Sequence, residues 1–185
     1  MGYNQIKMGI YDLEAHKRAA AWARDWLDNS VQYAMEGRVV APCCPETILE
    51  ALRPILPIKV DRIEDYTIGL GCGFSLTGEV CGAISGHIIA IGIDISSYTR
   101  ETALIRDRVL AYSRKYMYRF REKFGHWRCG DLLGFTLTDP DGLKKLQKRG
   151  EQRPNCLDYI EFAIMEPLPS EEPDTERNLI PQKKK

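Results

Sequence analysis

The segment from Glu79 to Ile95, EVCGAISGHIIAIGIDI, limits the fold of this chain more than any other stretch. It opens with small residues and continues with isoleucines: Gly82, Ala83, Ser85, Gly86, Ile88, Ile89 and Ile91. Such an element suits the inside of a core, where its small face packs closely against neighbours. A buried parallel strand is the competing interpretation, because isoleucine is β-branched. An unbroken span from Val80 to Ile93 is long for a strand, so we predict a buried helix.

Further helices are predicted on both sides of this segment, because apolar residues recur there at three- or four-residue spacing. The pattern covers residues 11–35 and 100–124, and a last helix covers residues 155–166. Pro45 opens a short helix that Pro54 ends. Residues 126–135 read as a short helical turn, TDPDG as a turn, and residues 143–149 as one or two helical turns.

The fold class predicted from these elements is all-α, a helical bundle of five or six helices in a single cysteine-motif domain over residues 1–168. Residues 169–185 are charged and rich in proline, which predicts a disordered tail. A length of 185 residues agrees with one domain.

Charge and hydropathy exclude two classes of partner. Twenty-six basic residues balance 26 acidic ones, whereas a nucleic-acid-binding protein needs an excess of Lys and Arg. The longest apolar stretch, Ile88 to Ile95, is too short to cross a bilayer, and the first residues do not resemble a signal peptide. We therefore expect a soluble, cytoplasmic protein, in which cysteines serve as metal ligands or catalytic thiols rather than as structural disulfides.

Four of the six cysteines are expected at the starts of helices. Cys44 precedes Pro45 at the expected cap of its helix, and Cys81, Cys129 and Cys156 lie at or near the start of theirs. The partial positive charge and unpaired N–H groups of a helix start favour a thiolate, and they would also favour a negatively charged iron–sulfur cluster. The alternative for each is a small buried hydrophobic residue. No pair has the C-x-x-C spacing of zinc ribbons or thioredoxin motifs.

The remaining candidates are two auxiliary thiols, Cys43 and Cys72, and a proton donor or ligand, His126. Cys43 is adjacent to Cys44, and Cys72 lies between two glycines, where it need only be small; either could also form or resolve a disulfide with a neighbour in the fold. His126 precedes Cys129 by three residues. His87, on an apolar helix, is expected to be a hydrogen-bonded core residue. GLGCGF lacks the third spacing of a dinucleotide-binding motif.

These motifs resemble a redox-active protein family named for a C…CGAxxG…C…C pattern. CGAISG, residues 81–86, matches the central motif, and GLGCGFSLTGEV resembles the glycine-rich approach to it. Cys44 matches the first family cysteine, Cys129 in FGHWRCGDLLG the third, and Cys156 in CLDYIEFA the fourth. The resemblance covers roughly residues 15–165, and the chain departs from it at Cys43, at Cys72 and in a longer connection between the third and fourth cysteines.

The resemblance implies a helical domain with four defining cysteines and a redox role. A similar domain occurs in split-Soret cytochromes, where an iron–sulfur centre has been suspected. This chain lacks a C-x-x-C-H haem attachment site, so haem is not implied.

Three functions follow for Cys44, Cys81, Cys129 and Cys156. The first is ligation of a [2Fe–2S] or [4Fe–4S] cluster for electron transfer or sensing, since thiolates on separate helices can converge at one end of a bundle. The second is thiol–disulfide oxidoreductase or redox-sensor chemistry. The third is a structural zinc site in an interaction module. Whether the chain is an enzyme stays open. The expected partners are a redox protein and a second copy of the chain, which would form a homodimer through exposed aromatic residues, Trp22, Trp127 and Tyr116.

Overall fold

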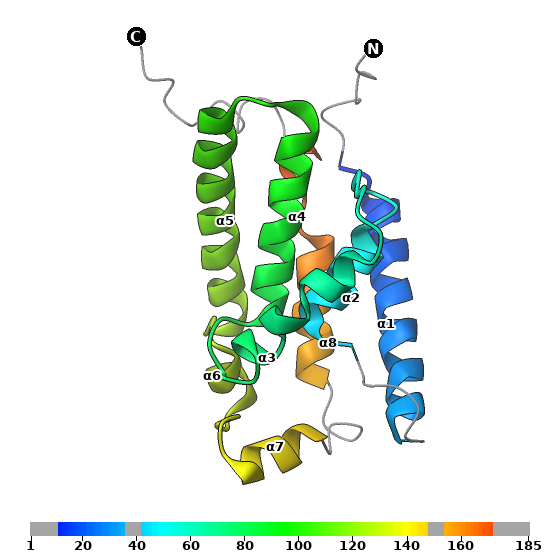
Figure 1. The fold of residues 1–185 in the computed structure, drawn as a ribbon, viewed down its shortest axis with the longest axis vertical. Coiled ribbons are helices and arrows are strands. Elements are labelled where there is room, and N and C mark those ends of the chain that lie inside the picture. Colours follow the sequence, from blue (N-terminus) through cyan, green and yellow to red (C-terminus); the bar gives the residue numbers. More distant parts are fainter. Residues whose placement is uncertain (1–10, 36–41, 148–153, 172–185) are drawn as a thin grey trace.

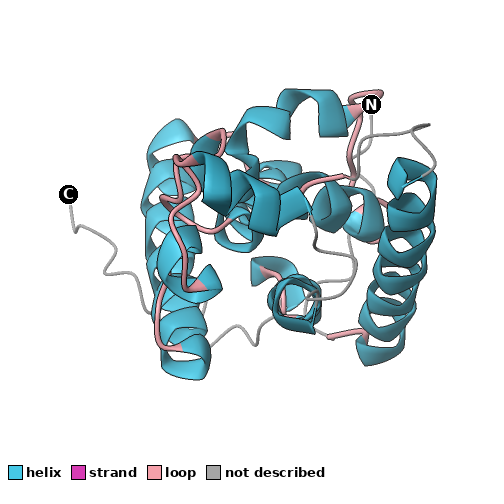
Figure 2. Ribbon diagram, turned by 90° about the horizontal axis from the view of Figure 1, so that it is seen from below, coloured by secondary structure: helices cyan, strands magenta, loops and turns pink. Residues whose placement is uncertain are grey.

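The computed structural model describes residues 11–35, 42–147 and 154–171, and nearly all of its regular structure is helical (Figure 1). The elements in chain order are α1 (Leu13–Met35), α2 (Cys44–Leu52), η1 (Ile63–Tyr66), η2 (Ile68–Leu70), α3 (Gly71–Phe74), α4 (Gly82–Tyr98), α5 (Thr102–Phe124), α6 (Cys129–Leu133), α7 (Pro140–Gln147), α8 (Pro154–Met165) and η4 (Pro169–Glu171). Seen from below, the described residues form helices joined by loops, without a strand (Figure 2). The all-α prediction is confirmed.

The described residues hold eight α-helices, so the predicted count of five or six was too low. The difference lies in short elements. Asp139 Oδ1 accepts a hydrogen bond of 2.6 Å from the amide of Gly142, and the chain enters α7 at Pro140, so the TDPDG segment starts a helix rather than forming only a turn. The glycine-rich segment contains η2 and α3.

The helix α4 lies at the centre of the bundle, and its face toward α2 is made of small residues. A Cβ atom added at Gly86 would lie 2.9 Å from the Cα atom of Pro45 and 3.3 Å from Cδ1 of Ile48. Glycine therefore lets the backbones of α4 and α2 approach closely. The prediction of a buried helix is confirmed, and the strand alternative is wrong.

An aromatic cluster fills the space between α5 and α8. Phe120 and Phe124 of α5 contact Tyr159 and Phe162 of α8, with ring centroids 4.7 to 5.9 Å apart. Tyr116 belongs to the same core and is only 3% exposed, so its prediction as an exposed aromatic residue was wrong. Its position continues the apolar stripe of α5, which faces inward.

Polar contacts fasten the chain after α8 to the rest of the bundle. The backbone amide and hydroxyl of Ser170 donate to the carboxylate of Asp94 on α4, at 2.8 and 2.6 Å. The carboxylate of Glu171 accepts from Nε2 of His16 on α1, at 2.9 Å. Residues 169–171 of the predicted tail thus form η4, and residues 172–185 lie outside the described residues.

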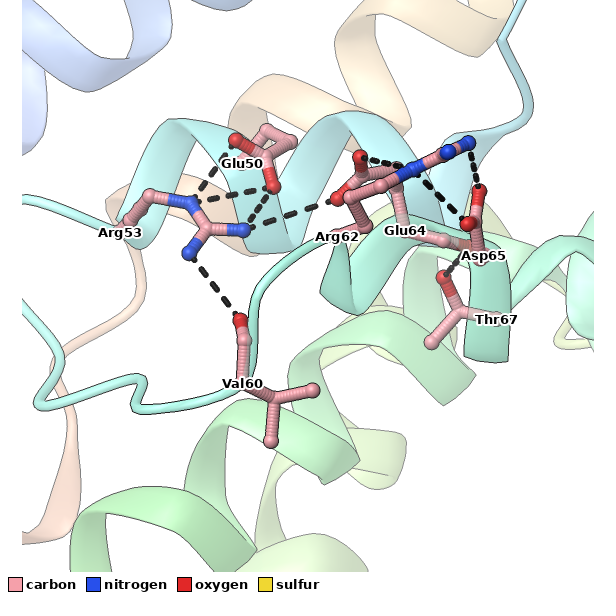
Figure 3. Close-up of polar contacts among 7 residues, drawn as sticks. All are labelled: Glu50, Arg53, Val60, Arg62, Glu64, Asp65 and Thr67. Atoms are coloured by element: carbon pink, nitrogen blue, oxygen red, sulfur yellow. Dashed lines mark hydrogen bonds and ion pairs between the residues drawn. The ribbon is translucent and has the colours of Figure 1, made fainter.

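A polar network holds the segment after α2 (Figure 3). Arg53 donates to the carboxylate of Glu50 at 3.0 and 3.1 Å and to the carbonyl of Val60 at 3.3 Å, and it pairs with Glu64 at 3.6 Å. Arg62 pairs with Asp65 at 2.9 Å. These contacts hold residues 53–67 against α2, and the glycine-rich segment follows directly after these residues.

No helix of the described residues is both long enough and apolar enough to span a bilayer.

Candidate functional site

All four family-motif cysteines lie at the starts of helices, as predicted. Cys44 is the first residue of α2, Cys81 is the N-cap of α4, Cys129 is the first residue of α6, and Cys156 is the third residue of α8. One detail differs from the prediction, because Cys43 rather than Cys44 caps α2. Its amide donates to Glu46 Oε2 at 2.5 Å, so the chain becomes helical one residue later than Cys43, at Cys44. The starts of α4 and α8 lie toward the lower end of the bundle in Figure 1.

A short antiparallel pairing brings Cys81 and Cys129 together. Val80 and Arg128 form its single bridge. The amide of Cys81 donates to the carbonyl of Trp127 at 2.8 Å, and the amide of Cys129 donates to the carbonyl of Glu79 at 2.6 Å. Side chains alternate along an extended backbone, so the two cysteines lie on the same side of the pairing. Both are buried, with 2% and 6% of their surface exposed.

Gly82 brings Cys44 to the start of α4. A Cβ atom added at Gly82 would lie 2.8 Å from Cδ of Pro45 and 3.1 Å from Cβ of Cys44. The glycine that follows Cys81 in CGAISG therefore has a steric reason, since any side chain would push the starts of α2 and α4 apart. Gly86 keeps the same two helices close one turn later.

Tyr159 on α8 is affected by the charges of the other three thiols. Burial, followed by the nearby charges of Cys156 and Cys81 and a smaller effect of Cys129, raises the pKa of Tyr159 to about 12. Burial and Cys81 also raise the pKa of Tyr116. Three of the thiols thus lie close enough to Tyr159 to affect its pKa, which was not predicted. Its spacing was a usable signal, because Tyr159 lies three residues after Cys156 and so on the same face of α8.

All six cysteines are thiols in the structure. Within the described ranges, no group of three or more His, Cys, Asp or Glu side chains takes up the positions of a metal site. The four family-motif thiols converge on one region of the bundle, yet they do not form a preassembled ligand cage. A metal would therefore have to draw them together, as is common where metal binding and folding are coupled.

Cys43 and Cys72 form a pair of their own. Their side chains hydrogen-bond to each other, and this bond, together with burial, raises the pKa of the Cys43 thiol. A Cβ atom added at Gly71, the residue before Cys72, would lie 2.6 Å from Sγ of Cys43. Both cysteines are half-buried. The sequence alone does not identify the partner of either cysteine, and the fold places the two side chains next to each other.

The loop that carries Cys72 has an uncommon backbone. Five consecutive residues have positive φ angles: Cys72 (51°), Gly73 (69°), Phe74 (57°), Ser75 (56°) and Leu76 (69°). For a residue with a Cβ atom this left-handed conformation costs about 1–2 kcal/mol. Only glycine fits at position 73, because an added Cβ would lie 2.6 Å from the amide nitrogen of Glu79 and 2.8 Å from Cβ of Cys129. The loop is therefore strained and lies directly against the candidate site.

His126 and His87 differ in their surroundings. His126 is 60% exposed, with Nδ1 3.9 Å from the carboxylate of Asp131, and its proposed role as proton donor or ligand stays a prediction. His87 is a core residue, as predicted: it is 1% exposed, hydrogen-bonds to the backbone at Ala163 and packs on Tyr116 with ring centroids 4.1 Å apart. Burial lowers the pKa of His87 to about 3.

The comparisons with known proteins agree with these motifs. The family model described as "Putative redox-active protein (C_GCAxxG_C_C)" matches residues 42–166, which is more than half of the 185-residue chain and includes all six cysteines. No curated protein and no solved structure matches the chain. The matched range contains CGAISG and the helix-start cysteines on both sides of it, and the chain belongs to the C_GCAxxG_C_C family of redox-active proteins.

Proposed function

We propose that the chain is a redox protein whose family-motif thiols, Cys44, Cys81, Cys129 and Cys156, bind an iron–sulfur cluster. The observation that carries this proposal is proximity: the pairing of residues 80 and 128 holds Cys81 near Cys129, Cys44 meets the start of α4 at Gly82, and Cys156 lies close enough to Tyr159, as do Cys81 and Cys129, to affect its pKa. Four thiols on four separate elements are the donor set of cysteine-ligated clusters. Such a cluster supplies one-electron transfer.

The protein contributes electrostatics and exclusion of water at this site. The starts of α2, α4 and α8 present backbone N–H groups and partial positive charge, which favour thiolates and reduce the cost of concentrated negative charge. Cys81 and Cys129 are buried, which keeps water from their sulfur atoms. Burial and hydrogen bonds to sulfur are among the factors that set cluster potentials.

Disulfide chemistry among the same four cysteines is the second candidate. The absence of a preassembled ligand group in the described residues favours it, since pairwise exchange needs only two sulfur atoms to meet at a time. In that case the site transfers two electrons with each disulfide formed or reduced.

Anaerobic purification, followed by an absorption spectrum and by iron, sulfide and zinc analysis, tests these candidates. Stoichiometric iron and sulfide with visible bands near ~400 nm, a rough expectation for thiolate-ligated iron, would support the cluster. Metal-free protein with a reversible loss of titratable thiols would support disulfide exchange. Colourless protein with stoichiometric zinc would contradict both and favour a structural role.

Serine variants make the test specific to residues. We expect Cys44→Ser, Cys81→Ser, Cys129→Ser and Cys156→Ser each to lose most of the iron. Cys43→Ser and Cys72→Gly serve as matched controls, because they change thiols of the same region that are outside the proposed ligand set. Retention of full iron by all four serine variants would refute the assignment of ligands.

A further inference from the structure

The thiols of Cys43 and Cys72 are placed for a reaction with each other. Cys43 caps α2, and Cys72 lies on the left-handed turn that packs against that cap. Their side chains already share a hydrogen bond, and Gly71 leaves no Cβ atom between the turn and Sγ of Cys43. Disulfide formation requires the two sulfur atoms to approach from contact to about 2.0 Å.

The backbone of Cys72 supports a reactive role for this pair. Its φ and ψ of 51° and 38° are left-handed, a conformation that favours glycine. If position 72 required only a small residue, glycine would suit its positive φ better than cysteine, and glycine is indeed present at position 73 of the same turn. Half-burial leaves both thiols within reach of solutes. Strain of this kind is typical of functional segments.

We propose that Cys43 and Cys72 are a second redox centre, a dithiol that external disulfides oxidise reversibly to an intramolecular disulfide. This centre goes beyond the proposed function, because it uses neither the four family-motif thiols nor a metal. Its substrate class is a low-molecular-weight disulfide, such as oxidised glutathione, or a protein disulfide.

The reaction balances as two thiol–disulfide exchanges. One protein thiolate attacks a sulfur atom of the external disulfide, forming a mixed disulfide and releasing the first external thiol. The second protein thiolate then attacks the protein sulfur of that mixed disulfide and releases the second external thiol. Two electrons pass from the protein to the external disulfide, and the two protons of Cys43 and Cys72 end on the released thiols.

A disulfide here would act on the neighbouring site through the loop. It would tie the turn at residues 72–76 to the start of α2, and this turn contacts Cys129 at Gly73. Cys44, the next residue after Cys43, belongs to the same helix start. The state of the second centre would thereby restrain two of the four family-motif cysteines.

The test is disulfide mapping on the full-length protein after equilibration with mixtures of oxidised and reduced glutathione. Remaining thiols are alkylated, and linked peptides are identified by mass spectrometry. Trypsin alone leaves Cys43 with Cys44 and Cys72 with Cys81, so a Glu-specific protease is needed to cut after Glu79. We expect a reversible link to Cys72 and the loss of two alkylatable thiols per chain.

Three variants assign the link. Cys43→Ser keeps a good helix cap and Cys72→Gly relieves the left-handed strain, so both are expected to fold. Each should abolish the link, whereas Cys44→Ala should retain it. A link that survives Cys43→Ser, a link of Cys72 to another cysteine, or full alkylation of all six thiols under oxidising conditions would overturn the proposal.

The test of the Cys43–Cys72 disulfide can be judged separately from the test of the iron–sulfur cluster. Iron content of Cys43→Ser and Cys72→Gly reports on the proposed function, and the linked peptide reports on the second centre. Failure of either leaves the other measurement interpretable.

Discussion

The two halves of α4 are held in the bundle by different means. Toward its start, Gly82 and Gly86 let α4 approach α2 so closely that an added Cβ atom would lie 2.8 or 2.9 Å from Pro45. Toward its end, Gly92 has no neighbouring atom within 4 Å of such a position, and Asp94 fastens η4 through Ser170. The start of α4, the thiol end, is held by close backbone packing at glycines. Its opposite end, the polar end, is held by hydrogen bonds of polar side chains.

This difference determines how each end responds to change. Close backbone approach at the thiol end is sensitive to added volume and is independent of pH. The opposite end contains His16, which is fully buried between two acceptors: Nδ1 faces the carbonyl of Ile164 and Nε2 faces the carboxylate of Glu171. Both ring nitrogens must therefore donate, which requires the imidazolium form and makes this end sensitive to pH.

The largest expected effect contrasts two glycines of α4. Gly86→Ala should lower the free energy of unfolding, because overpacking costs about 1–3 kcal/mol. Gly92→Ala should raise it by up to about 1 kcal/mol, since alanine is the better helix former and meets no neighbour. Both changes gain the same helix propensity, so the two variants should differ by the overpacking cost alone, about 1–3 kcal/mol in urea denaturation. Equal stabilities would contradict the close packing of α4 on α2.

The second prediction concerns the hydrogen bond between His16 and Glu171 at the polar end. Burial alone would lower the pKa of His16, but hydrogen bonds to Glu171 and to the carbonyl of Ile164 outweigh it, and the pKa is raised. The stabilisation is therefore complete below the unfolded-state pKa of 6.5 and is lost as pH rises through the folded-state pKa. Glu171→Gln should cost about 2 kcal/mol near pH 6 and less at alkaline pH.

Denaturation curves of wild type and Glu171→Gln at several pH values measure this difference. Glu14→Gln is the matched control, because Glu14 forms an exposed ion pair with Lys17 on the same helix as His16. A cost for Glu171→Gln that stays constant into alkaline pH would mean that His16 is neutral in the folded protein.

A third, smaller effect concerns the strained loop. Cys72→Gly should raise the free energy of unfolding by about 1 kcal/mol under reducing conditions, because glycine adopts positive φ without a steric penalty. Gly134→Ala is the reciprocal control: its φ is 74° with no atom within 4 Å of an added Cβ, so it should lose a similar amount. A destabilised Cys72→Gly would show that the contacts of this thiol outweigh the strain.

Most of the helical fold could be predicted from the sequence, because the spacing of apolar residues indicates which face of each helix is buried. The predicted starts and ends of α1, α5 and α8 agree with the structure to within two residues. The α4 prediction was correct in type but five residues short at its end, since Asp94 and the serines after it read as polar. Asp94 is buried there by Ser170, a contact between residues 76 positions apart that no local pattern records.

The candidate site was only partly predictable. Helix-start placement of Cys44 and Cys81 follows from Pro45 and from the small residues after Cys81, which are local signals. The pairing of Cys43 with Cys72 depends on a left-handed turn, and its residues (Cys72, Phe74, Ser75 and Leu76) have no intrinsic preference for that conformation. Tertiary contacts impose the turn, so its geometry becomes visible only in the fold.

The smallest expected effect concerns the network that delivers the loop to α2 (Figure 3). The Arg53 side chain is 34% exposed and contacts Glu50, Glu64 and the carbonyl of Val60. The Arg62 side chain is 74% exposed and pairs mainly with Asp65. Arg53→Ala should therefore cost about 0.5–1 kcal/mol in urea denaturation, and Arg62→Ala close to nothing.

The two variants also differ in the expected pH dependence. The hydrogen bonds from Arg53 lower the pKa of Glu50. This contribution to stability is present above the unfolded-state pKa of Glu50 and is lost as pH falls through the folded-state value. The cost of Arg53→Ala should accordingly shrink in acid, while that of Arg62→Ala stays small throughout. If both variants cost the same at neutral pH, side-chain burial does not decide the strength of this network, and the loop owes its position to the glycine contacts at Gly71 and Gly73.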